Sequence, residues 1–167
     1  MIQHKTINLQ PGDVYFSQLG DQVQQPIKIK TILGSCVAVT IWHENSRSGG
    51  MCHYLLAQES EAAKTTKQLQ KYRYGDEALD YLLKKMSLIQ PINEFELALF
   101  GGSNMYISSV SPSIGESNIT FAQTWAKENN LVFTQEDTLG SLGRSISLDL
   151  TNGNIEVSKY PVEPKEL

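Results

Sequence analysis

A cysteine and a histidine that each follow a glycine-containing turn are the residues of this chain best suited to chemistry. Cys36 comes directly after Gly34-Ser35, and His53 comes shortly after Gly49-Gly50, each beside an apolar, strand-like run. A thiol attacks as the thiolate, and a neighbouring imidazole is a common base for producing it at neutral pH. The preceding glycines allow the backbone to turn tightly and to approach a substrate closely. The pattern therefore predicts a candidate catalytic pair.

The distance between these two residues depends on how their strands pair. A simple hairpin of residues 37–42 with 51–56 places Thr40 opposite His53, which leaves Cys36 about 13 Å from His53 along the strands. The two side chains then meet only if the pairing is offset, or if the segments diverge into different sheets or a short helix. Without such a meeting, Cys36 is a small buried apolar residue and His53 is a core histidine.

A catalytic imidazole normally has a third group that orients it. Thr31, five residues before Cys36, offers a hydroxyl on the adjoining strand. Its alternative interpretation, which the local sequence alone favours, is an ordinary β-branched strand residue. Cys52 is expected in the core, because neighbouring residues on a strand point to opposite faces and Cys52 therefore points away from the side chain of His53.

Metal and cofactor chemistry find little support in the sequence. The two cysteines and three histidines show no paired ligand spacing, so we expect no zinc site or other metal. His4 lies in the terminal segment and His43 in a polar loop, and both are expected to be solvated. Gly101-Gly102-Ser103 follows a strand-like run, but it lacks the Lys-Ser/Thr of a phosphate loop and the third glycine of a dinucleotide fingerprint.

The composition predicts one globular domain over residues 1–167. Hydrophobic residues make up 40% and charged residues 19% of the chain, which is ordinary for a folded protein. The net charge of −4, with scattered Lys and Arg, disfavours nucleic-acid binding. The N-terminus has no signal-peptide core, and no apolar run is long enough for a membrane span. We therefore expect a cytoplasmic protein, without membrane insertion, whose thiols stay reduced.

Hydrophobic periodicity predicts a mixed α/β (α+β) fold with several antiparallel pairings and few helices, unlike a regular β-α-β alternation. A helix is expected over 75–88, and a second from near Ser117 to Asn129-Asn130. Residues 58–73 are expected to form a long surface loop, and Asn152-Gly153 predicts a hairpin. The expected strands are residues 12–16, 27–33, 37–42, 51–56, 95–100, 131–137, 144–150 and 154–159.

Several motifs in one order resemble the CheD family, the bacterial chemoreceptor glutamine deamidases. The resemblance covers about residues 10–160 and is carried by Thr31-Ile32-Leu33-Gly34-Ser35-Cys36-Val37-Ala38-Val39, Gly49-Gly50-Met51-Cys52-His53, Tyr74-Gly75, Phe100-Gly101-Gly102-Ser103-Asn104-Met105, Ile114-Gly115-Glu116-Ser117-Asn118 and Leu142-Gly143-Arg144. The chain departs from the usual family pattern at Cys52, commonly asparagine, at Ser103, commonly alanine, and at Gly140-Ser141, commonly Gly-Gly.

This resemblance implies a fold and a set of roles. The fold would be a mixed, largely antiparallel β-sandwich with flanking helices, similar to the cysteine-hydrolase domain of cytotoxic necrotizing factors. Cys36 would be the nucleophile, His53 the general base and acid, and Thr31 the residue that orients the histidine. The implied activity converts selected glutamines on the cytoplasmic helices of chemoreceptors to glutamate. A CheC-type phosphatase is the implied second partner.

The chemistry needed for such a reaction passes through a thioester on Cys36 and requires no cofactor. Backbone N–H groups at Gly34 and Ser35 are candidates to stabilise the oxyanion. Recognition of a helical substrate is expected from residues 58–73 and 101–115, and Met51, Tyr54 and Tyr106 are candidates to line the entrance, with core packing as the alternative for each. Two alternative functions remain: a non-catalytic adaptor that binds receptors or the phosphatase, and a cysteine hydrolase of small amides.

Overall fold

The computed structural model describes residues 3–18, 25–58, 71–89, 91–105 and 111–163. Its described part contains two sheets, two α-helices and two short 3₁₀ turns. The strands are β1 (Lys5–Asn8), β2 (Val14–Gln18), β3 (Ile27–Leu33), β4 (Val37–His43), β5 (Ser48–Tyr54), β6 (Glu96–Gly101), β7 (Phe133–Thr138), β8 (Gly143–Asp149) and β9 (Ile155–Tyr160). The helices are α1 (Gly75–Ser87) and α2 (Ile114–Glu128), and the turns are η2 (Lys71–Arg73) and η3 (Ile92–Glu94).

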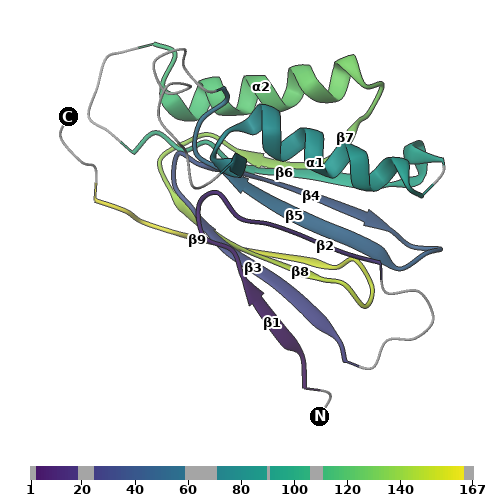
Figure 1. Ribbon diagram of the computed structural model, residues 1–167. Helices are drawn as coiled ribbons and strands as arrows, with labels where there is room; N and C mark the ends of the chain where they lie inside the picture. The colour runs from purple at the N-terminus through teal and green to yellow at the C-terminus, as the bar shows by residue number, and fades with distance from the viewer. Residues whose placement is uncertain (1–2, 19–24, 59–70, 90, 106–110, 164–167) are drawn as a thin grey trace.

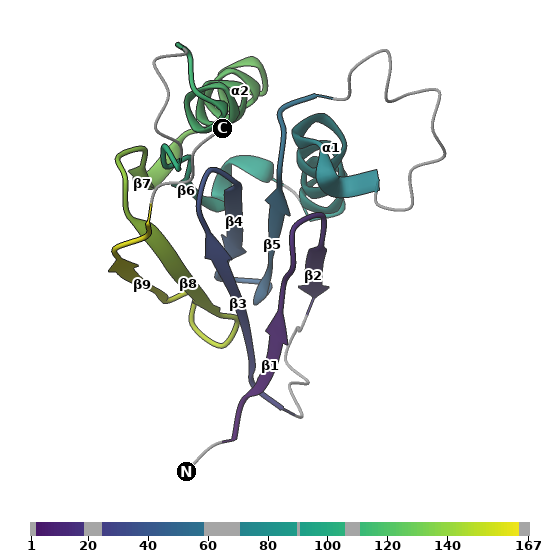
Figure 2. The same ribbon diagram turned by 90° about the vertical axis from the view of Figure 1, so that its left-hand side faces the viewer.

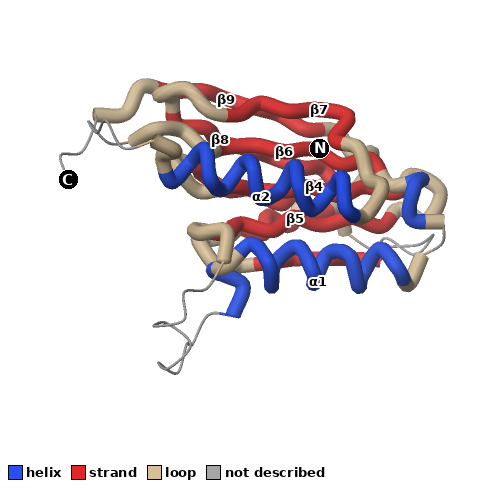
Figure 3. The backbone as a smooth tube through the Cα atoms, turned by 90° about the horizontal axis from the view of Figure 1, so that it is seen from above, coloured by secondary structure: helices blue, strands red, loops and turns tan. Residues whose placement is uncertain are grey.

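The strands form a sandwich of a four-stranded sheet, in the order β1-β3-β8-β9, and a five-stranded sheet, in the order β2-β5-β4-β6-β7. Both helices lie over the outer face of the five-stranded sheet (Figure 1), and seen from above they run side by side across it (Figure 3). The four-stranded sheet covers the opposite face. Because the five-stranded sheet is covered on both faces, β4 and β5 are buried along their whole length.

Alternation along the strands divides the core into two layers. Between the sheets, Ala38, Met51 and Phe100 pack with Ile29 and Ile146 of the four-stranded sheet. Under the helices, the neighbouring strand residues Val39, Cys52 and Leu99 pack with helix residues such as Leu79 and Ala122. In β3 every second residue is buried, as expected for a strand with one solvated face.

A short turn carries the chain from one sheet to the other. Strand β3 belongs to the four-stranded sheet and β4 to the five-stranded sheet, so residues 34–36 cross the edge of the sandwich (Figure 2). Beyond the turn, β4 pairs with β5 on one side and β6 on the other. This crossing places the end of β3 opposite the end of β5, across the core.

The predicted α+β class is confirmed, and the pairing is largely antiparallel. Among the described strands only β1–β3 and β6–β7 pair in parallel, and the other pairs are antiparallel. The helix predicted over 75–88 is confirmed as α1. The expectation for α2 is wrong at its start, which lies at Ile114, because Ser113 and Glu116 form a capping box.

The remaining differences concern short or marginal segments. Strand β1 carries no clear apolar alternation and was not predicted, and β5 begins at Ser48, three residues before the predicted start. Of the expected surface loop over 58–73, residues 59–70 lie outside the described part of the chain, as do Tyr106 and residues 107–110 of the expected contact region. Among the described helices, none combines the length and apolar character needed to cross a membrane.

Candidate active site

The pairing of β4 with β5 makes the separation of Cys36 and His53 along the strands shorter than the simple hairpin predicts. Ala38 lies opposite His53, so the simple-hairpin prediction of Thr40 opposite His53 is wrong by two residues. The reason is the early start of β5, which leaves only residues 44–47 for the turn. Cys36 therefore lies two residues beyond the position opposite His53, about 7 Å along the strand instead of about 13 Å. Of the alternatives left open by the sequence, the offset pairing is the one observed.

Thr31 reaches His53 across the sandwich. Its hydroxyl Oγ1 lies 2.7 Å from His53 Nδ1 and 2.9 Å from the carbonyl oxygen of Leu9, and the contact is buried. A hydroxyl has one hydrogen, and the Leu9 carbonyl can only accept, so Thr31 donates to Leu9. It follows that Thr31 accepts from His53 and that the proton of the neutral imidazole is on Nδ1. The lone pair of His53 is therefore on Nε2.

The ring of His53 is held in a dry environment. His53 is 1% exposed, and its backbone N–H donates to the carbonyl of Asp13 at 3.0 Å. The backbone N–H of Gly12 donates to the carbonyl of His53 at 2.8 Å. Nε2 is the only buried side-chain nitrogen or oxygen of the described residues that has no hydrogen-bond partner. Burial lowers the pKa of His53 to about 4, against a small opposing effect of Asp13. The imidazole is thus neutral at pH 7, with an unengaged base nitrogen.

Cys36 is half-buried and packs against the core between the sheets, the layer toward which the His53 ring also points. Burial raises the pKa of its thiol, and the hydrogen-bonding effect of its own backbone N–H opposes this only in part. The resting pair is therefore a neutral thiol and a neutral imidazole. Catalytic hydrogen bonds are often absent before substrate binds and form only in the complex.

The turn that carries Cys36 is held by hydrogen bonds to all three of its carbonyl groups. Ser103 N–H donates to the Gly34 carbonyl at 3.0 Å, and Gly102 N–H donates to the Cys36 carbonyl at 2.9 Å. The Ser35 carbonyl accepts from a side chain of α2 at 3.1 Å. Gly101 has φ of +107°, and a Cβ there would lie 2.2 Å from the Cys36 carbonyl oxygen. A side chain at Gly101 would therefore displace the turn.

Comparison of the sequence with known proteins identifies the family of this chain. Residues 55–159 match the family described as CheD chemotactic sensory transduction. The chain is 35% identical over 159 residues to a "Probable chemoreceptor glutamine deamidase CheD 1" of Chromobacterium violaceum, covering 93% of this chain and 78% of the relative. The chain belongs to the CheD family. Proteins named "Probable chemoreceptor glutamine deamidase CheD" from Pseudomonas syringae pv. tomato and Methanosarcina barkeri are each 33% identical, over 96% and 79% of this chain and 92% and 86% of the relatives.

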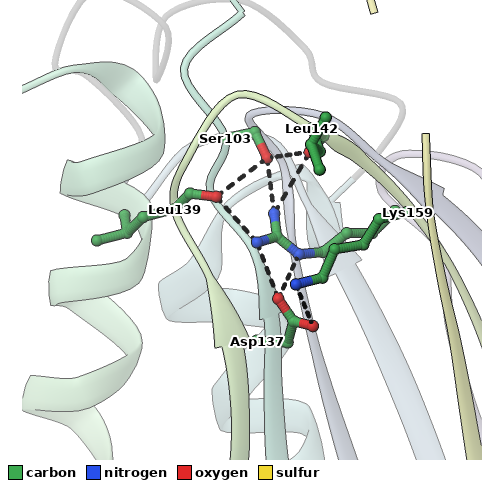
Figure 4. Close-up of polar contacts among 6 residues, drawn as sticks. Ser103, Asp137, Leu139, Leu142 and Lys159 are labelled. Carbon is green, nitrogen blue, oxygen red and sulfur yellow. Dashed lines mark hydrogen bonds and ion pairs between the residues drawn. The ribbon is translucent and has the colours of Figure 1, made fainter. Parts of the chain in front are cut away.

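In this CheD family member, Ser103 and Arg144 are the buried members of a polar cluster that also contains Asp137 and Lys159 (Figure 4). The Ser103 hydroxyl accepts from Arg144 Nη1 at 2.7 Å and donates to the Leu142 carbonyl at 2.6 Å. Arg144 also pairs with Asp137 at 3.0 Å, which links β8 of one sheet to β7 of the other. Although burial raises it, hydrogen bonds from Lys159 and Arg144 leave the pKa of Asp137 below its ordinary value. The cluster stabilises the loop after β6, whose N–H groups at Gly102 and Ser103 donate to the turn that carries Cys36.

The other candidate ligands and thiols lie away from the site. Cys52 is buried under the helices, on the face opposite His53, as predicted, and burial raises its pKa to about 12. The expectation that His43 is solvated is wrong: it is 4% exposed and bonded to Ser46 and Glu94 at the far end of β4. His4 is partly exposed and pairs with Asp149 at 3.2 Å. Within the described ranges, no three His, Cys, Asp or Glu side chains could jointly hold a metal ion.

The residue that sequence reasoning missed is Asn118. It belongs to a motif that carried the family resemblance, but its type and position on a helix predicted no role. Its side-chain amide donates to the carbonyls of Ser35 and Leu55. A polar residue on the buried face of an otherwise amphipathic helix is a signal of such a contact, although the partner becomes visible only in the folded chain.

The low pKa of His53 predicts a pH-dependent loss of stability. The unfolded chain protonates His53 below about pH 6.5, whereas the folded chain resists protonation down to about pH 4. The free energy of unfolding therefore falls as the pH drops through this window, by about 2.5 kcal/mol at pH 4.5 from this residue. Urea unfolding at pH 7 and pH 4.5 measures the drop, and His53→Gln should reduce it by that amount. An unchanged pH dependence in His53→Gln would contradict the assignment.

Proposed function

We propose that this protein is a cysteine-dependent protein-glutamine deamidase that acts on chemoreceptors. The observation that carries the proposal is the Thr31–His53 hydrogen bond of 2.7 Å, which leaves Nε2 of the buried ring without a partner, in the layer between the sheets against which Cys36 also packs. The names of the relatives supply the substrate class, since they are described as chemoreceptor glutamine deamidases. We infer that Cys36, His53 and Thr31 act as nucleophile, base and orienting residue.

In the first step, the Cys36 sulfur attacks the carbonyl carbon of a glutamine side chain. Because both groups are neutral at rest, the thiol proton passes to His53 Nε2 as the carbon–sulfur bond forms, and the carbonyl π electrons move to oxygen. The resulting oxyanion needs fixed donors, and the backbone N–H groups of the Gly34-Ser35-Cys36 turn are our candidates. Removing one such donor typically costs about 3 kcal/mol of transition-state stabilisation.

In the second step, the imidazolium of His53 donates its Nε2 proton to the amine nitrogen, and ammonia leaves as the carbonyl reforms. The product of this step is a thioester between Cys36 and the former glutamine. Water then attacks the thioester while His53 Nε2 accepts its proton, and the proton returns to the departing thiolate. The glutamine has become glutamate, and the free thiol and neutral imidazole are restored. The residues supply all the acid–base steps without a cofactor.

The proposed substrates are glutamines on the cytoplasmic helices of chemoreceptors, so the proposed location is the cytoplasm. A CheC-type phosphatase is the proposed second partner, on the family resemblance alone. The half-buried position of Cys36 fits a substrate that brings its side chain to the end of the sandwich.

Mass spectrometry of receptor cytoplasmic fragments incubated with the protein tests this proposal. The expected result is a gain of about 1 Da at particular glutamines, from replacement of an amide by an acid, and none in fragments kept without the protein. Binding of the fragment without any conversion would replace the deamidase by the adaptor alternative. Equal activity on free glutamine and on the fragment would favour a hydrolase of small amides.

A further inference from the structure

Asn118 bridges the two segments that carry the proposed nucleophile and base. It lies on α2 and is 1% exposed. Its two amide hydrogens go to different segments: Nδ2 donates to the Ser35 carbonyl at 3.1 Å and to the Leu55 carbonyl at 2.7 Å. Ser35 immediately precedes Cys36, and Leu55 follows His53 by two residues. One side chain therefore contacts both arms of the site.

The side chain of Asn118 lies just beyond the point where the hydrogen-bond ladder between β4 and β5 ends. The β4–β5 ladder ends with the pair Val37 and Tyr54, so no backbone rung joins the residues beyond it. In a continuing ladder the carbonyls of this region would accept from the opposite strand. The amide of Asn118 takes that place for Ser35 and Leu55, because a primary amide offers two donors at a fixed spacing.

The position of the amide is itself fixed by close packing of α2. The hydroxyl of Tyr54 donates to the Asn118 backbone carbonyl at 2.6 Å. Near the start of the helix, a Cβ on Gly115 would lie 2.1 Å from the Gly102 carbonyl oxygen, so α2 approaches the 101–105 loop backbone to backbone. Gly102 in turn donates to the Cys36 carbonyl. The helix, the turn and the end of β5 thus form one connected unit.

We propose that Asn118 is a positioning residue that sets the separation of Cys36 from His53. The inference rests on the proposed deamidase function but concerns geometry, which can be measured without turnover. Without the amide, the Ser35 and Leu55 carbonyls turn toward water and the two arms drift apart. A displacement of about 1 Å at reacting groups can cost about 100-fold in rate. The loss should appear in kcat, since Asn118 is buried and does not contact a substrate.

Two measurements on Asn118→Leu test the proposal. Leucine has the same number and branching of side-chain heavy atoms as asparagine, although its two methyl groups are bulkier, and it removes both donors. We expect kcat for receptor-fragment deamidation to fall about 100-fold with little change in KM. The second measurement is the rate of alkylation of Cys36 by iodoacetamide from pH 6 to 9, a reaction in which His53 can accept the thiol proton. In Asn118→Leu this assistance should be lost, so that the plot of rate against pH coincides with that of His53→Ala. Cys52 is buried on the other face and reports separately in the peptide map.

Matched variants separate positioning from stability. Asn129→Leu removes a side-chain amide that donates to a backbone carbonyl, at 2.8 Å, at the far end of the same helix, and Ile41→Val destabilises the core of β4. Both should keep the wild-type alkylation profile and kcat. If Asn118→Leu does not fold, Asn118→Ser decides: it retains one donor and should give an intermediate loss of kcat and an intermediate profile.

Failure of the positioning role and failure of the proposed deamidase function give different experimental results. If the wild type does not deamidate the fragment, the alkylation profiles still report whether Asn118 controls the Cys36–His53 pair. A folded Asn118→Leu or Asn118→Ser with the wild-type alkylation profile would overturn the positioning role. A profile that changes equally in Asn129→Leu would overturn it as well.

Discussion

We expect Cys36→Ala to abolish conversion of receptor glutamines to glutamate, with a loss of at least about 10⁴-fold, while fragment binding is retained. Removing the nucleophile of a covalent mechanism eliminates the pathway and leaves only binding and oxyanion stabilisation. Alanine fits the half-buried position, which packs against the layer between the sheets, so the fold should be preserved. Site-resolved mass spectrometry of the fragment, with binding measured in parallel, checks both parts of the expectation.

The matched control is the second cysteine. Cys52→Ala removes a thiol from the helix-facing core, where burial raises its pKa to about 12. It should cost some stability through the cavity left behind but keep conversion near the wild-type rate. Retained activity in Cys36→Ala, or loss of activity in a folded Cys52→Ala, would reverse the assignment of the nucleophile.

We expect Thr31→Val to lower kcat for deamidation by about 100- to 1000-fold, with a smaller change in KM. Valine has nearly the shape of threonine but cannot accept from His53 Nδ1, so the ring loses the contact that assigns its proton to Nδ1. A comparable change of tautomer in the serine protease triad costs about 10⁴-fold. We expect a smaller loss because a threonine hydroxyl, unlike a carboxylate, does not stabilise the imidazolium by charge.

Thr31→Ser is the control for this prediction, because it keeps the hydroxyl and removes only a methyl group. It should retain activity within about threefold of the wild type, since the hydrogen bonds to Leu9 and His53 can persist. Steady-state kinetics on the receptor fragment, with unfolding curves for both variants, separate catalysis from stability. Full activity in Thr31→Val would return Thr31 to the status of an ordinary strand threonine.

The resting state of the site has a consequence for its reactivity. With the thiol pKa of Cys36 raised and the pKa of His53 lowered by burial, the pair does not exist as a thiolate and imidazolium before substrate arrives. In the proposed mechanism, proton transfer would then accompany attack. Such a site is less exposed to oxidation than one with a permanent thiolate, because oxidants react with the thiolate form.

The sequence by itself determined the class of fold and most of the elements, and it indicated which residues are candidates for the reaction. Alternation in residues 27–33 and the apolar face of residues 75–88 are local patterns, and both elements form where they were predicted. The glycine turn before Cys36 marked it as a candidate because a backbone conformation is a local property. The turn expected at Gly49-Gly50, before His53, is wrong, because both glycines lie inside β5 and pair with β2 and β4. The start of α2 was misjudged only because the capping box of Ser113 and Glu116 was not used.

Only the tertiary structure decided which candidates meet. Strand register is a relation between segments, and a shift of two residues separates the simple hairpin from the observed pairing of Ala38 with His53. Thr31 reaches His53 because β3 and β5 lie in different sheets that face each other, which no local pattern contains. The bridge by Asn118 spans 83 residues to Ser35, and a contact of that range exists only once the helix has packed on the sheet.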